Sequence, residues 1–221
     1  MICNLFPEPL YFFFSSEVPS LLYYSHVPAT IAALLVGLFV FLNGRKFLLS
    51  QLLLVISICF SLWTLLNLIL WTNIHGDFLL FIWPFLTILS GMIFIFCVYF
   101  IYVFLEKKDI SFSIKGIFLA FLAPIIILGP TNLSIGGFNI TRCDAFMFEG
   151  FWYNLYYTSL CALSMVWILA LLIRKYRVVD SDFRKQIVLM GIGIEFFLFS
   201  FFTLVFLGGY LTDIGVLPDS S

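Results

Sequence analysis

Long runs of apolar residues, separated by short polar stretches, fill most of this chain. Six such segments cover residues 19–42, 47–71, 78–105, 112–130, 151–173 and 186–208. An α-helix rises about 1.5 Å per residue and needs about 20 residues to cross the hydrocarbon of a bilayer. Five segments meet this length easily, so the pattern predicts a bundle of membrane-spanning helices.

The fourth segment, 112–130, is the exception, because it is short and carries Pro124 in its middle. The basic residues nevertheless argue that it spans. If all six segments cross, ten of the eleven Lys and Arg residues fall on one side and only Arg142 on the other. Without a fourth span, the five basic residues of 174–185 would lie opposite those of the earlier connections.

Cytoplasmic loops are enriched in Lys and Arg, because these residues resist translocation when they lie near a span. The charge distribution therefore predicts six spans, with the amino terminus outside and a basic turn between the last two spans in the cytoplasm. The residues that anchor this turn at the inner surface are Arg174, Lys175, Arg177, Arg184 and Lys185.

Composition agrees with a membrane protein. Of the 221 residues, 63% are hydrophobic and only 10% are charged, whereas soluble domains carry about 25% charged residues. The partner that this composition demands is the lipid bilayer. A net charge of −1, without a basic face, argues against nucleic acid. No cofactor or metal is expected, since His26 and His75 are isolated from each other.

The predicted helix bundle occupies residues 19–211. It lies between an outer or interfacial segment at 1–18, which lacks the basic start of a signal peptide, and a short outer tail at 212–221. Cys3 and Cys143 both fall on outer segments, so an oxidising compartment would allow them to form a disulfide. The sequence leaves that pairing open.

The longest outer connection joins the fourth and fifth segments and contains the stretch LSI-GG-FNI. Glycine tolerates the positive φ angles of two-residue hairpin turns. We therefore expect a β-hairpin with its turn at Gly136 and Gly137 and with Ile135 opposite Phe138. Its apolar face would form a small outer lid on the helix ends. An irregular loop is the alternative.

Glu195 is the one ionisable residue well inside a span, about 13 Å from Gln186 at helical rise. Such a carboxyl is costly in lipid and usually faces the bundle interior. Asn67 and Thr64, in the second segment, are the expected partners, because polar groups link helices in membranes. Two interpretations stay open: a position that couples to a ligand, proton or signal, and a structural carboxyl bonded to a neighbouring helix.

Four apolar and aromatic stretches carry a family resemblance: FSLWTLLNLILWT, APIIILGPTNL, FWYNLYY and RKQIVLMGIGI. They resemble the N-terminal seven-helix sensing region of bacterial membrane histidine kinases. This resemblance implies a sensor of two-component signal transduction, with a cytoplasmic kinase domain or partner and a homodimeric assembly. The chain departs from the seven-span plan, because the thirteen residues after the sixth segment are too few and too polar to cross the membrane.

No nucleophile is paired with a base in any catalytic motif, and the kinase and phosphoacceptor regions are absent from this chain. We therefore expect an all-α integral membrane protein of the bacterial cytoplasmic membrane that acts as a non-catalytic signal-sensing module. A small transporter or channel subunit is the alternative that Glu195 suggests. A scaffold that binds other membrane proteins is a third.

Overall fold

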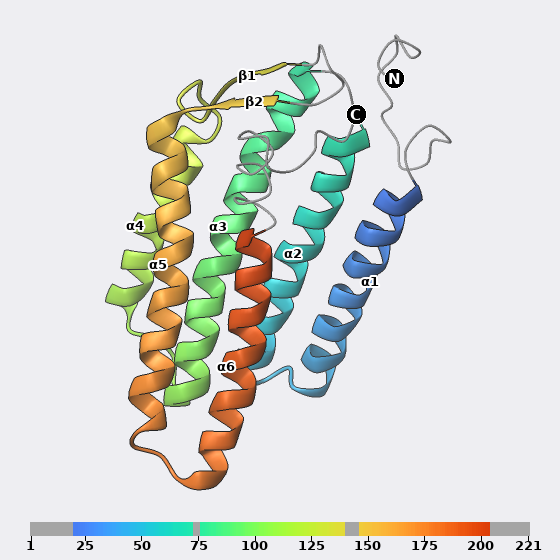
Figure 1. The fold of residues 1–221 in the computed structure, drawn as a ribbon. Helices are drawn as coiled ribbons and strands as arrows, with labels where there is room; N and C mark the ends of the chain where they lie inside the picture. The colour runs from blue at the N-terminus through green and yellow to red at the C-terminus, as the bar shows by residue number, and fades with distance from the viewer. Residues whose placement is uncertain (1–19, 73–75, 140–145, 204–221) are drawn as a thin grey trace.

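The computed structural model describes residues 20–72, 76–139 and 146–203, which form six α-helices and two short β-strands (Figure 1). In chain order these are α1 Ser20–Asn43, α2 Leu48–Thr72, α3 Gly76–Glu106, α4 Phe112–Leu128, β1 Ile135–Asn139, β2 Phe146–Glu149, α5 Phe151–Tyr176 and α6 Ser181–Phe202. Each helix overlaps one of the six apolar segments, and α6 begins five residues before its segment. The predicted all-α membrane bundle is confirmed.

Five of the described helices, all except α4, are long and apolar enough to cross a membrane. The helix α4 has 17 residues, which at about 1.5 Å each falls short of about 30 Å of hydrocarbon. It continues through Pro124. Nearby, the hydroxyl of Tyr156 on α5 donates a hydrogen bond to the carbonyl oxygen of Phe121, at 2.8 Å.

The longest helix, α3, is the centre of the bundle and packs against α2, α4, α5 and α6 (Figure 1). Its 31 residues are apolar on nearly every face, and Ile93, Phe94 and Ile101 are fully buried. A helix that is hydrophobic all round is stable only when its neighbours cover it. At the edge, α1 packs mainly against α2.

The outer helices present large apolar side chains to the surroundings. Phe39 on α1 is 69% exposed, Leu163 on α5 is 62% exposed and Leu189 on α6 is 78% exposed. Contiguous apolar surface of this kind is normally covered by a partner or by lipid. Together with the length of the helices, it identifies an integral membrane protein.

Small residues hold α1 against α2. A Cβ atom built on Gly37 would lie 2.6 Å from both Cβ and Oγ of Ser57, so only glycine allows the two helices to approach this closely. One turn further along α2, Ser61 Oγ donates a hydrogen bond to the carbonyl oxygen of Thr30, at 3.2 Å. Small and hydroxyl residues drive helix association in lipid, where burial of apolar surface gives no advantage.

The connections α1–α2, α3–α4 and α5–α6 lie at one end of the bundle (Figure 1). We call it the basic end, because it carries ten of the eleven Lys and Arg residues, as the alternation of the segments requires. These residues are Arg45, Lys46, Lys107, Lys108, Lys115, Arg174, Lys175, Arg177, Arg184 and Lys185.

At the opposite end, which we call the sheet end, β1 and β2 pair antiparallel between α4 and α5. Here the predicted hairpin is wrong. Gly136 and Gly137 form no turn but lie inside β1, where the register shifts between Ile135 and Phe138. Phe138 pairs with Met147 rather than with Ile135. Glycine inside a strand often marks such an irregularity.

A tertiary contact explains the different pairing. The strand β1 packs on α3, and β2 leads directly into α5. Gly150 closes this connection: its amide donates to the carbonyl oxygen of Ser134 at 2.9 Å, and a Cβ there would lie 1.8 Å from the carbonyl oxygen of Leu133. The pairing is therefore set by how the sheet joins two helices and not by the local turn.

The Gly37→Ala substitution tests the close contact between α1 and α2. The added methyl group overlaps the Ser57 side chain, and overpacking of this kind costs about 1–3 kcal/mol. We expect the free energy of unfolding to fall by that amount in detergent titrations. Adding Ser57→Gly to this variant removes the opposing Cβ and should restore most of the stability.

Gly193→Ala on α6 is the matched control, because nothing in the described part of the chain lies within 4 Å of a Cβ at that position. Alanine there should be neutral or slightly stabilising. Equal effects of the Gly37 and Gly193 substitutions would contradict the close α1–α2 contact.

Candidate functional site

Glu195 carries its carboxyl group into the interior between α6, α3 and α2. Its Oε1 atom is buried and has no hydrogen-bond partner among the described residues. The carboxyl lies close enough to interact electrostatically with the Cys97 thiol on α3, which in turn interacts with Cys59 on α2. Both thiols are buried in the main core. The carboxyl thus has the Cys97 thiol as a polar neighbour, and no described residue donates a hydrogen bond to Oε1.

An aromatic cluster closes this interior toward the sheet end. Phe201 of α6 packs edge-on against Trp63 of α2, with ring centroids 4.6 Å apart, and lies 6.0 Å from the ring of Phe94 on α3. Phe197, on the same helix, packs edge-on against Phe60 at 5.4 Å. Pairs of this geometry stabilise beyond their buried area, and they hold α6 against α2 and α3 within two turns of Glu195.

The predicted partners of Glu195 make their hydrogen bonds elsewhere. Thr64 Oγ1 donates to the carbonyl oxygen of Phe60 on its own helix, at 2.8 Å. Asn67 Nδ2 lies 3.1 Å from Nε2 of His26 and so links α2 to α1. His26, isolated in the sequence, finds this partner because α1 and α2 run antiparallel side by side.

The chemistry open to this interior is limited. No three His, Cys, Asp or Glu side chains gather into a possible metal site within residues 20–72, 76–139 and 146–203. An unpaired carboxyl oxygen in an apolar interior is costly. A proton or a small cation that reached Oε1 would give it the polar partner that the described side chains do not provide.

Two polar contacts join α3 to α5, one near each end of the bundle. At the sheet end, Tyr153 donates a hydrogen bond to Thr87 Oγ1, at 3.0 Å. At the basic end, Lys175 Nζ lies 3.2 Å from Glu106 Oε1. The partners are 66 and 69 residues apart, so the two helices run in the same direction in nearly constant register. Neither pair was predicted from the sequence, because single polar residues at span ends carry no periodic signal.

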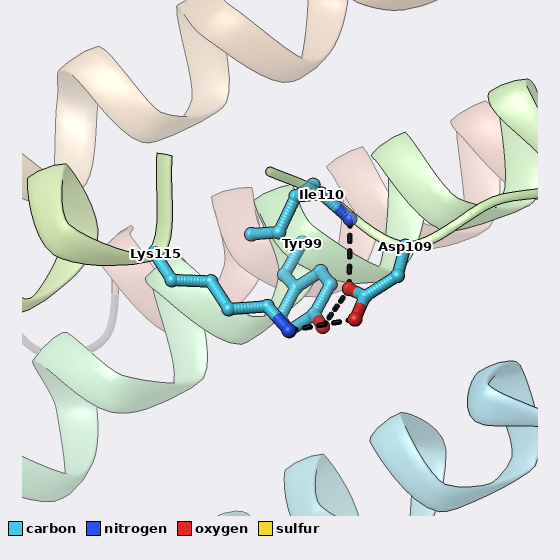
Figure 2. A network of polar contacts seen from close by, with 4 residues as sticks. All are labelled: Tyr99, Asp109, Ile110 and Lys115. Carbon is cyan, nitrogen blue, oxygen red and sulfur yellow. Dashed lines mark hydrogen bonds and ion pairs between the residues drawn. The ribbon is translucent and has the colours of Figure 1, made fainter. Parts of the chain in front are cut away.

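Asp109 organises the α3–α4 connection (Figure 2). Its carboxylate accepts hydrogen bonds from the Tyr99 hydroxyl and from the Ile110 amide, the latter at 2.7 Å, and pairs with Lys115 Nζ at 2.6 Å. The hydrogen bond from Lys115, and then that from Tyr99, hold the pKa of Asp109 below its ordinary value of 3.8. The network ties the first turn of α4 to the last turns of α3.

The α5–α6 turn is held by two aromatic contacts. Arg184 lies 5.5 Å from the ring of Tyr176, and its Nε donates to the carbonyl oxygen of Val179 at 2.8 Å. Lys107, whose positive φ of 54° ends α3, places its ammonium 5.0 Å from the ring of Phe183. The end of α3 is thereby fixed to the beginning of α6.

The predicted anchors of this turn divide into two groups. Lys175 and Arg184 make the contacts given above. Arg174, Arg177 and Lys185 are exposed, and their side chains make no hydrogen bond or ion pair within the described part of the chain.

The remaining predicted positions are described only in part or not at all. Cys3 and Cys143, the expected disulfide, lie outside the described residues, as do the segments 1–18 and 212–221. The expected lid is described only through its backbone, as part of β1.

No protein-family model, no curated protein and no solved structure matches this chain.

Asp109→Asn tests the network at the α3–α4 connection. Because the folded-state pKa of Asp109 is lowered, the ionised carboxylate adds stability above its unfolded pKa. That contribution is lost as the pH falls through the folded-state pKa. The variant should melt at a slightly lower temperature than the wild type at pH 7, and the difference should shrink as the pH falls below 3.8, the ordinary pKa of an Asp carboxyl.

Lys108→Gln is the control, since it removes a neighbouring exposed charge without touching the network. Its melting temperature should follow the wild type at every pH. A difference between wild type and Asp109→Asn that is the same at pH 7 and pH 3 would contradict the assignment.

Proposed function

We propose that this protein is a membrane signal-sensing module, in which the parallel helices α3 and α5 carry a displacement from the sheet end to the basic end. The observation that supports this most directly is the pair of polar contacts between these helices. Thr87–Tyr153 and Glu106–Lys175 join them about 29 Å apart along α3, at 1.5 Å per residue. Because α3 and α5 are joined at both of these points, a displacement of one helix is expected to move the other with it.

The sheet is suitably placed to receive a signal. The strand β2 is separated from α5 only by Gly150. The backbone of Gly150 lies so close to Leu133 that no side chain would fit between them. The strand β1 packs on α3. A ligand that displaced the sheet would therefore act on the first turn of α5, where Tyr153 contacts α3. A ligand shifts such an equilibrium only through its differential affinity for the two states.

The same proposal sets the orientation. With the basic end in the cytoplasm, the amino terminus and the sheet are outside. The short helix α4 then also crosses the membrane, which brings the number of spans to six. The tied helix ends and the α5–α6 turn then face a cytoplasmic effector. This arrangement fits the sequence resemblance to the input region of bacterial histidine kinases, in which sensing is separate from catalysis.

Distance measurements between spin labels test the coupling. Labels at Arg45→Cys and Arg177→Cys, in a Cys3→Ser/Cys143→Ser background, report on the basic end in nanodiscs; Cys59, Cys97 and Cys161 are buried. Nanobodies selected against the sheet end supply the perturbation. We expect at least one of them to shift the label distance by about 2 Å, the scale of helix displacements in switching proteins.

The double variant Tyr153→Phe/Glu106→Leu removes both polar contacts and should abolish the shift while nanobody binding persists. Tyr156→Phe is the matched control, because its hydroxyl bonds α4 and not α3. Bound nanobodies that leave the wild-type distances unchanged would contradict the sensing function. A shift that survives in the double variant would exclude the α3–α5 route.

Proton- or cation-coupled transport is the second candidate, and the buried Oε1 of Glu195 favours it. An intramembrane carboxyl without a partner is a frequent feature of ion and proton pathways. A pathway of this kind would use the interior between α2, α3 and α6 and would require no movement of the sheet.

Proteoliposomes that contain a pH-sensitive dye test this candidate. Under a potassium gradient with valinomycin, the wild type should admit protons faster than protein-free liposomes. Glu195→Gln keeps the shape of the side chain but removes its ionisable group, so the rate should fall to that of protein-free liposomes. Cys161→Ala, a buried change elsewhere in the core, should leave it unaltered. A wild-type rate equal to that of empty liposomes would eliminate transport of protons.

A further inference from the structure

At the basic end, the end of α3 and the α5–α6 turn carry more basic side chains than there are acidic side chains to pair with them. Residues 106–108 and 174–185 contain seven Lys and Arg residues and three acidic residues. One of the acids, Glu106, is already paired with Lys175. The side chains of Arg174, Arg177 and Lys185 are exposed and make no hydrogen bond or ion pair with the described residues. A positive surface of this kind attracts anions.

The lipid-facing sides of α5 and α6 locate this charge relative to the membrane. Ile173 is 53% exposed and lies four residues before Arg177, while Leu189 is 78% exposed and lies four residues after Lys185. Residues four apart share a helix face. Both faces therefore change from apolar to basic within one turn, or about 6 Å. This change marks the boundary between hydrocarbon and headgroups.

The basic groups are also presented on a preformed support. Arg184 fixes the turn through the carbonyl oxygen of Val179 and the ring of Tyr176. Lys107 fixes the end of α3 to Phe183 at the start of α6. A ligand that binds here pays little to order the backbone, and preorganisation of this kind raises affinity.

We propose that Arg174, Arg177 and Lys185 bind the phosphate group of an anionic phospholipid, with its acyl chains along Ile173 and Leu189. A soluble phosphate compound shares the headgroup chemistry, but it would leave those apolar side chains without a contact. The site is independent of the proposed function, because lipid binding at this end requires neither sensing nor transport.

Native mass spectrometry of the full chain in neutral detergent tests the site. Phosphatidylglycerol and phosphatidylcholine with identical acyl chains are titrated, and the dissociation constant of the first bound lipid is measured. We expect phosphatidylglycerol to bind at least several-fold more tightly. Arg177→Gln/Lys185→Gln should weaken it about thirtyfold, since each basic residue near the surface contributes about 1 kcal/mol. Arg177→Lys/Lys185→Arg should retain the affinity.

Arg45→Gln/Lys46→Gln is the matched control, because it removes the same charge from the α1–α2 connection at the same end and should change the affinity less than twofold. Equal binding of the two lipids, or equal losses in the two Gln double variants, would overturn the site. Displacement of bound phosphatidylglycerol by millimolar glycerol phosphate would assign the basic groups to a soluble anion and overturn the lipid proposal. Preferential capture of an acidic peptide over the lipid would overturn it in favour of a protein partner.

Discussion

Inside the hydrocarbon of a bilayer no water is available, so every backbone N–H and C=O group must find its partner within the protein. This constraint explains why the described spans are helical and why each proline needs attention. Pro28, Pro84 and Pro124 all lie within helices, where each removes a backbone donor. Side chains act close to two of them: Thr87 donates to the carbonyl oxygen of Pro84 at 3.0 Å, and Tyr156 bonds α4 near Pro124.

The same solvent changes what holds the helices together. Lipid tails are as apolar as leucine, so helices associate through close packing and a few polar contacts. Different pairs of helices in this bundle are held together by different kinds of contact. A glycine–serine contact brings α1 against α2, two polar pairs join α3 to α5, and an aromatic cluster holds α6 against α2 and α3. The central helix α3 takes part in two of these three kinds of contact, and for this reason the proposed signal route follows it.

The charged groups of the basic end and the carboxyl group of Glu195 lie in contrasting surroundings. At the basic end four of the ten basic side chains have a partner in an aromatic ring, a carboxylate or a carbonyl oxygen, and the exposed ones lie where water reaches them. In the interior, Oε1 of Glu195 has no such partner among the described residues. Stability favours the first arrangement, and an isolated polar group in lipid is commonly retained for function. This contrast is why both a sensing and a transport function are proposed for one bundle.

The sequence by itself determined the elements and their direction. Uninterrupted apolar runs allow only helices in lipid, and the alternation of connections gathers ten of the eleven basic residues at one end. Tertiary structure decided which side chains meet. Asn67 contacts His26 instead of Glu195, and β1 pairs with β2 instead of turning at Gly136 and Gly137. The physical reason is that hydropathy depends on each residue's own preference for lipid or water. A polar contact between helices depends on their rotation and register, which only the packed bundle defines.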